Sequence, residues 1–201
     1  FRDCGVDGLL LITPYYNKSN EEGIYQHFKY VLDRTGIPSI LYNIPGRTGC
    51  SISVANVARL ATHPNVWGIK EASGNISYAT DVACYLSDDF HMMSGNDDMI
   101  VPIMSIGGCG VISVWANCMP AAVHNMCRDY LTGDVEAARR VQLDNLELIH
   151  ALFYEVNPIP VKAAMARMGL IQEYYRQPLW PMAEKNAERL EDAMRGVGLL
   201  A

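Results

Sequence analysis

The most restrictive feature of the sequence is a series of short apolar runs, each followed by a segment with helical spacing. Five such runs begin near residues 8, 39, 66, 90 and 110, at intervals of 20 to 31 residues. The runs are apolar at consecutive positions, which is typical of strands buried on both faces. Strands that alternate with helices at this spacing predict a parallel sheet covered by helices, which is an α/β fold.

The boundaries of these elements follow from capping and turn residues. The first helix is expected to begin at a capping box formed by Ser19 and Glu22, and a later helix at Asp97. Beyond Trp115 the pattern contains helices only, and Asp134 is expected to cap one of them. The expected strands cover 8–13, 39–42, 66–69, 90–94 and 110–114, and the expected helices cover 19–34, 53–61, 77–86, 97–106, 158–168 and 181–197.

Composition excludes several classes of partner. The 201 residues are 50% hydrophobic and 19% charged, as in an ordinary soluble protein, and the net charge of -6 without a basic cluster argues against nucleic acid and anionic membranes. Six cysteines without a C-x-x-C pair are interpreted as reduced, mostly buried thiols of a cytosolic protein. The five histidines lack ligand spacing, so no metal site is proposed.

One long uncharged stretch resembles a membrane span. Residues 99–127 contain no Asp, Glu, Lys or Arg over 29 residues, which is long enough to cross a bilayer. Prolines and glycines divide it into pieces that are too short to do so. We therefore expect a helix, a turn, a strand and the start of another helix inside a soluble fold.

Lys70 ends the third apolar run and is the strongest candidate for chemistry. A lysine held against apolar walls loses hydration of its ammonium form, so its pKa falls and the free amine becomes able to attack a carbonyl group. The alternative is a strand-end lysine that extends to solvent and is ion-paired to Glu71. The residues at the neighbouring strand ends favour the first interpretation.

The carboxyl ends of parallel strands share one face of a sheet or barrel, and that face carries active sites. Tyr42 and Lys70 end consecutive strands, so the phenol is expected within reach of the amine, where it could move the proton that dehydration of a carbinolamine requires. Arg47 follows Tyr42 closely, and its planar guanidinium suits a carboxylate. Individually each residue has a packing or surface alternative, but together they predict an imine-forming site for a keto acid.

Four motifs give the chain a family resemblance over its whole length. They are TPYYN at 13–17, YNIPGRTG at 42–49, GIKEASGN at 68–75 and NPIPVK at 157–162. The chain resembles the dihydrodipicolinate synthase family, within the superfamily of pyruvate-dependent class I aldolases and N-acetylneuraminate lyases. The resemblance implies a TIM (β/α)8 barrel with a C-terminal helical extension. It also implies a lyase that condenses pyruvate with L-aspartate 4-semialdehyde, in the biosynthesis of diaminopimelate and lysine.

The resemblance assigns roles to individual residues. Lys70 would form the imine with pyruvate, Tyr42 would donate and accept protons, and Arg47 would hold the carboxylate of the aldehyde. Tyr16 would reach the site of a neighbouring subunit as part of a proton relay. The remaining implied residues are Gly95 and Ile112, which would line the pyruvate pocket through backbone groups.

The resemblance also implies the setting in which the chain works. No cofactor is expected, and the partners are the two small substrates and further copies of the chain, in a dimer or tetramer, with no nucleic acid and no membrane. The expected location is the cytoplasm. Tyr15 resembles a residue at the dimer interface, near the lysine-feedback site of regulated members.

The chain departs from the family pattern in identifiable places. By motif order its strands correspond to the fourth to eighth of the barrel, with a partial barrel over 1–133 and a helical layer over 134–201. No residue matches the paired threonines that complete the family's proton relay, and Asn96 and Trp115 replace an aspartate and a threonine. Trp115 is expected either to narrow the pocket or to pack. Two alternatives therefore stay open: another 2-keto-acid aldolase or dehydratase, and a catalytically inactive fragment.

Overall fold

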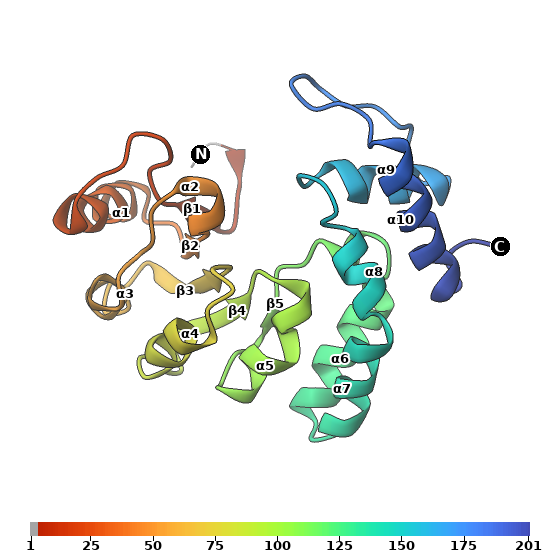
Figure 1. Cartoon of the computed structure of the whole chain (residues 1–201). Coiled ribbons are helices and arrows are strands. Elements are labelled where there is room, and N and C mark those ends of the chain that lie inside the picture. The colour runs from red at the N-terminus through yellow and green to blue at the C-terminus, as the bar shows by residue number, and fades with distance from the viewer. Residues whose placement is uncertain (1–3) are drawn as a thin grey trace. The chain divides into compact units, whose positions relative to one another are not determined.

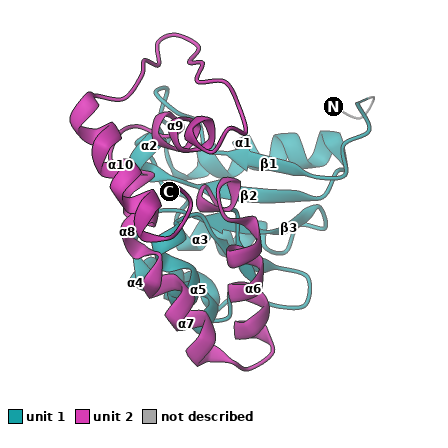
Figure 2. Cartoon of the chain, turned by 90° about the vertical axis from the view of Figure 1, so that its right-hand side faces the viewer, with its two compact units in different colours: residues 1–112 teal, residues 113–201 magenta. Residues whose placement is uncertain are grey.

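A computed structural model describes residues 4–201, and the chain divides into two compact units (Figure 2). The first unit, Phe1–Ile112, holds the sheet, and the second, Ser113–Ala201, is helical. Helix α6 (Pro120–Leu131) belongs to the second unit, where it packs along α7 (Val135–Asp144). The division predicted after residue 133, which assigns α6 to the barrel, stays a prediction.

The sheet of the first unit contains five strands that are parallel and lie side by side in chain order (Figure 1). Chain order is the expected result when each strand is joined to the next by one short helical crossover. The parallel α/β fold predicted from the spacing is therefore confirmed. The strands are β1 (Leu9–Ile12), β2 (Ser39–Asn43), β3 (Val66–Glu71), β4 (His91–Ser94) and β5 (Gly110–Val111).

Three helices of the first unit, which begin at Glu21, Val54 and Ile76, start where a side chain accepts a hydrogen bond from a free backbone N–H group. Two of the predicted caps are wrong. Asn20, not Ser19, caps the first helix, because its Oδ1 accepts a hydrogen bond from the Gly23 N–H at 2.9 Å. Asp97 opens a short 3-10 turn, and the helix that follows has Met99 at its N-cap with no side-chain cap. These helices are α1 (Glu21–Thr35), α2 (Pro45–Thr48), α3 (Val54–Leu60), α4 (Ile76–Ala83) and α5 (Ile100–Ser105).

One face of the sheet forms the hydrophobic core of this unit. Leu41, Ile69 and Met92 project from the central strands and are completely buried against side chains of α1, α3, α4 and α5. Phe28 and Leu32 are the largest contribution from α1. We call this face the covered face, and the opposite one the inner face.

The pairing of β2 with β3 contains a register shift that decides which residues face which side. Ser39 pairs with Val66, but the next residue, Ile40, pairs with Gly68, so Trp67 is an extra residue in β3. Because of this shift, Val66 and Ile69 both reach the covered face although they are three positions apart. Trp67 instead lines a cavity on the inner face.

The second unit consists of a series of helices after a 3-10 turn at Trp115–Asn117. Trp115 is completely buried, and the 3-10 turn that it opens contacts α6 and α9 (Ile159–Arg167), so of its two expected roles the structure shows packing. Asp134 caps α7 as predicted, by accepting from the Ala137 N–H at 3.0 Å. The remaining helices are α8 (Leu146–Ala151) and α10 (Glu184–Gly196).

Between residues 4 and 201, no helix is both long and apolar enough to cross a membrane, and the uncharged stretch at 99–127 is divided among α5, β5 and α6. The expectation of mostly buried thiols is wrong. Three of the six free cysteines are exposed: Cys4, Cys84, which is the C-cap of α4, and Cys109, which precedes β5. Only Cys118 is fully buried.

Candidate active site

Lys70 and Tyr42 lie side by side at the carboxyl ends of β3 and β2. They are register partners, so their side chains project to the same face of the sheet. The Lys70 Nζ lies 4.3 Å from the centroid of the Tyr42 ring. The two residues predicted to act together are therefore adjacent, on the inner face.

The surroundings of both groups change their protonation in the direction that imine chemistry needs. Burial lowers the pKa of the Lys70 amine, and the nearby Asp97 carboxylate opposes this by raising it. Burial raises the pKa of the Tyr42 phenol, while the charge of Arg47 lowers it. A larger fraction of the lysine is thus a free amine than in solution, and the phenol keeps its proton at neutral pH.

Gly95 lies directly against the lysine. Its N–H donates to the Glu71 carbonyl oxygen at 2.6 Å, which extends the hydrogen bonding between β3 and β4 beyond the strand ends. A Cβ atom at this position would lie 2.6 Å from the Ala72 Cβ and 3.0 Å from the Lys70 Cε. Only glycine therefore fits here without moving the reactive side chain.

Arg47 is presented by a short turn that follows Tyr42. The turn is the four-residue helix α2, and the buried Thr48 fixes it by donating to the carbonyl oxygens of Ile44 and Cys50 at 3.1 and 2.8 Å. Arg47 itself is exposed, and its charge acts on the Tyr42 phenol. A cation at the rim of the strand ends can receive an anionic substrate group.

Tyr16, which was predicted to reach the site of a neighbouring subunit, is not buried in its own chain. Its side chain is 97% exposed, and its backbone has a φ of 63°, a conformation that is uncommon for a residue other than glycine. The loop after β1 thus holds an aromatic side chain out into solvent. The exposed ring is therefore available to another molecule.

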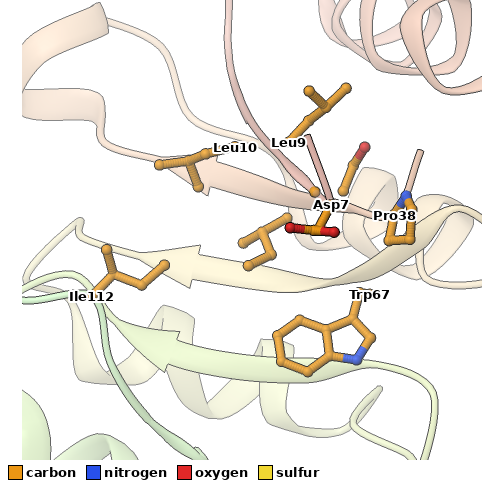
Figure 3. Close-up of a pocket in the computed structure, with 9 residues that line it drawn as sticks. Asp7, Leu9, Leu10, Pro38, Trp67 and Ile112 are labelled. Atoms are coloured by element: carbon orange, nitrogen blue, oxygen red, sulfur yellow. The ribbon is translucent and has the colours of Figure 1, made fainter. Parts of the chain in front are cut away.

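Ile112 connects the strand ends to an apolar cavity on the inner face. Its N–H donates to the Ser94 carbonyl oxygen at 2.9 Å, and the residue also lines a cavity of about 570 Å³. Figure 3 shows Leu10, Trp67 and Ile112 around this space, with Trp67 and Pro38 toward the amino ends of the strands. The cavity therefore lies mainly away from Lys70, and it is not the space in which the amine would react.

The alternative of an ion pair between Lys70 and Glu71 is wrong. Glu71 is the next residue on the strand, so it projects to the covered face, where its carboxylate accepts from Asn43 Nδ2 at 2.7 Å and from the Ser73 N–H at 2.6 Å. Burial raises the pKa of this carboxyl group, and the hydrogen bonds from Asn43 and Ser73 lower it. Alternation along the strand was a signal in the sequence that could have separated Glu71 from the lysine.

Fold and sequence together define an α/β protein of the TIM-barrel type, with an amine at the strand ends where enzymes of this class carry their chemistry. The family model described as the dihydrodipicolinate synthetase family matches residues 1–196, and the chain belongs to this family.

Curated relatives and solved structures agree with this assignment. The chain is 48% identical over 196 residues to 4-hydroxy-tetrahydrodipicolinate synthase 1 of Clostridium acetobutylicum, covering 98% of this chain and 67% of the relative. It is 42% identical to the dihydrodipicolinate synthase structure of Thermotoga maritima, with a TM-score of 0.95 over 98% of this chain and 68% of that one. The enzyme of Acinetobacter baumannii, solved in complex with pyruvate, is 40% identical with a TM-score of 0.95, over 99% and 68%. This chain thus spans about two thirds of the length of each.

Proposed function

We propose that this chain is a 4-hydroxy-tetrahydrodipicolinate synthase, a Schiff-base lyase of lysine and diaminopimelate biosynthesis, and that Lys70 forms the imine. The observation that carries the assignment of the site is the half-buried amine of Lys70, 4.3 Å from the ring of Tyr42 at the strand ends. Relatives named for this activity support the substrates, pyruvate and L-aspartate 4-semialdehyde.

The geometry supports a sequence of proton transfers around one nitrogen. The free amine of Lys70 attacks the keto carbon of pyruvate and gives a carbinolamine. Tyr42 donates a proton to the departing hydroxyl group, so that water leaves and the imine forms. The Tyr42 phenolate takes a proton from the methyl group and gives an enamine. The enamine carbon attacks the aldehyde carbon of the second substrate, and Tyr42 returns the proton to the aldehyde oxygen. The amino group of that substrate then displaces Lys70 and closes the ring.

Three further residues have proposed supporting roles. Arg47, exposed beside the phenol, would bind the carboxylate of the aldehyde substrate. Gly95 and Ile112 would line the pyruvate pocket through backbone groups, since both lie at the strand ends, where their N–H groups donate to the carbonyl oxygens of Glu71 and Ser94.

The exposed Tyr16 supports action as a homo-oligomer. An aromatic side chain held in solvent by an unusual backbone conformation gains little in a lone chain, but it can complete the site of a neighbouring copy. We propose a dimer or tetramer in the cytoplasm, in which Tyr16 enters the relay of the adjacent subunit.

Borohydride trapping tests the imine directly. Reduction in the presence of pyruvate is expected to add one pyruvate-derived group to the chain, located on Lys70 by peptide mapping. Lys70→Ala is expected to lose the adduct completely. A folded wild-type chain that shows no pyruvate-dependent adduct would sink the assignment and leave the inactive-fragment alternative, which the unmatched paired threonines of the family suggest.

Arg47→Ala separates the two substrates. The variant is expected to keep pyruvate trapping within about threefold, while condensation with the semialdehyde falls by roughly 10²-fold or more, because a charge-assisted contact to the second substrate is lost. The measurement is product formation from both substrates beside the trapping rate. Equal condensation rates for wild type and variant would contradict the role of Arg47, and a wild type that traps pyruvate but does not condense it with the semialdehyde would favour another keto-acid aldolase or dehydratase.

A further inference from the structure

The ends of β2 and β3 are joined on the covered face by a chain of buried hydrogen bonds that the proposed reaction does not use. The Ile52 N–H donates to Asn43 Oδ1 at 3.0 Å, Asn43 Nδ2 donates to Glu71 Oε2 at 2.7 Å, and the Ser73 N–H donates to Glu71 Oε1 at 2.6 Å. The Tyr78 hydroxyl donates to the Ile52 carbonyl oxygen at 2.7 Å, and this is the last hydrogen bond of the chain. We call these residues the clamp.

The clamp lies immediately behind the reactive pair. Asn43 follows Tyr42 and Glu71 follows Lys70, and the two clamp residues are themselves register partners. Because successive residues of a strand face opposite sides, Asn43 and Glu71 on the covered face hold the backbone directly next to the two positions that carry the phenol and the amine on the inner face. The Ala72 N–H adds a backbone bond to the Asn43 carbonyl oxygen at 2.9 Å.

The order of donors and acceptors in the clamp is fixed. A backbone N–H can only donate, so the Ile52 N–H requires the amide oxygen of Asn43 as its acceptor. The NH2 group of Asn43 is therefore turned toward Glu71. Ser73 likewise requires an acceptor at Glu71. Both side chains are buried, at 0% and 3% exposure, so a wrong pairing would leave an unsatisfied group away from water.

We propose that Asn43 and Glu71 are positioning residues of the imine site. Through their hydrogen bonds they hold the ends of β2 and β3 in register, and this keeps the amine of Lys70 against the ring of Tyr42. The proposal rests on the proposed function of Lys70. The donor and acceptor order of the clamp, and not the identity of its two side chains, is what the reaction requires.

Single exchanges break that order in two ways. Glu71→Gln places an NH2 group against either the Ser73 N–H or the Asn43 amide, so two donors face each other. Asn43→Asp places two carboxylates in contact, and they can form a hydrogen bond only if one of them binds a proton. Each variant is expected to slow pyruvate-dependent trapping at Lys70 by about 10-fold to 10²-fold, as displacement of a reacting group by about an ångström does.

The double variant Asn43→Asp with Glu71→Gln restores the order with the carboxylate exchanged. Asp at 43 accepts from the Ile52 N–H and from the Gln NH2 group, and Gln at 71 accepts from the Ser73 N–H. Trapping is expected to return to within about threefold of wild type, because the chemistry of each contact is again matched. Asp81→Asn, an exposed acid-to-amide exchange on α4, is the matched control and is expected to change nothing.

A second readout works without substrate. The pH dependence of acetylation of Lys70 by acetic anhydride, followed by peptide mapping, reports how well the amine is desolvated. In each single variant the midpoint is expected to move upward, toward that of an exposed lysine, and in the double variant to return. If the wild type does not trap pyruvate, the proposed function fails, but this midpoint still decides whether the clamp positions the amine.

Two results would overturn the proposal. One is a single variant that folds and retains the wild-type trapping rate and acetylation midpoint. The other is a double variant that unfolds at the wild-type temperature but reacts as poorly as the single variants. Should neither single variant fold, the double variant decides alone, since wild-type reactivity supports the proposal and slow reactivity from a folded sample contradicts it.

Discussion

The two faces of the sheet are made from alternate residues of the same strands, yet they differ in how completely they are packed. On the covered face Leu41, Ile69 and Met92 are fully buried against helices. On the inner face Leu10 and Trp67 are each 46% exposed beside an open apolar cavity. The packing that stabilises this unit is therefore concentrated on the covered face, while the reactive amine and phenol lie on the inner face.

A matched pair of neighbours on β2 gives the largest expected difference. Leu41→Ala is expected to lower the free energy of unfolding by about 2–5 kcal/mol, because it leaves a cavity in a closed core. Ile40→Ala, on the inner face, is expected to cost less than half of that, since no enclosed cavity forms. Denaturant unfolding of both variants measures the difference, and equal losses would show that the inner face is also packed.

Gly95→Ala tests a closely packed position beside the lysine on the inner face. The new methyl group would meet the Ala72 Cβ and the Lys70 Cε, so a loss of about 1–3 kcal/mol in unfolding free energy is expected together with slower trapping of pyruvate. Gly46→Ala is the control, because a Cβ atom there meets nothing within 4 Å. If both variants behave alike in unfolding and trapping, contact with the lysine is not what requires glycine at 95.

The smallest expected effect is a dependence of stability on pH. The pKa of Lys70 is lowered in the folded chain, so between that pKa and about 10.4 the unfolded chain binds more protons, and stability rises with pH across this window. Below the window the cost of burying the charged amine is fully present. We expect the gain to be below about 1 kcal/mol, because the half-exposed amine is partly screened.

Lys70→Met isolates this contribution. The variant is expected to lose this part of the rise in unfolding free energy between pH 7 and 9.5, measured by denaturant unfolding beside wild type. The upper limit stays below the range in which Tyr42 titrates, because its raised pKa acts in the opposite direction at higher pH. An unchanged slope in Lys70→Met would mean that the amine is solvated as in the unfolded chain.

Much of the fold and part of the site could be predicted from the sequence. Strand order followed from the spacing of apolar runs, and this order placed Tyr42 beside Lys70. The choice between Ser19 and Asn20 as a cap could not be made, because both side chains can accept a hydrogen bond and the backbone conformation decides. The clamp was also missed, since pairing of Asn43 with Glu71 depends on register rather than on spacing along the chain.

The extra residue in β3 has a consequence for how this strand tolerates insertions and deletions. Alternation alone would place Val66 and Lys70, four positions apart, on the same side, and the irregularity at Trp67 is what separates them. Deletion of Trp67 would produce an uninterrupted ladder and still deliver the amine to its present side. Deletion of Gly68 would instead bring Trp67 to a position where a Cβ atom lies 2.3 Å from the His91 carbonyl oxygen, and deletion of Ile69 would remove a completely buried core side chain. We therefore expect the strand to tolerate deletion of Trp67 but not deletion of Gly68 or Ile69.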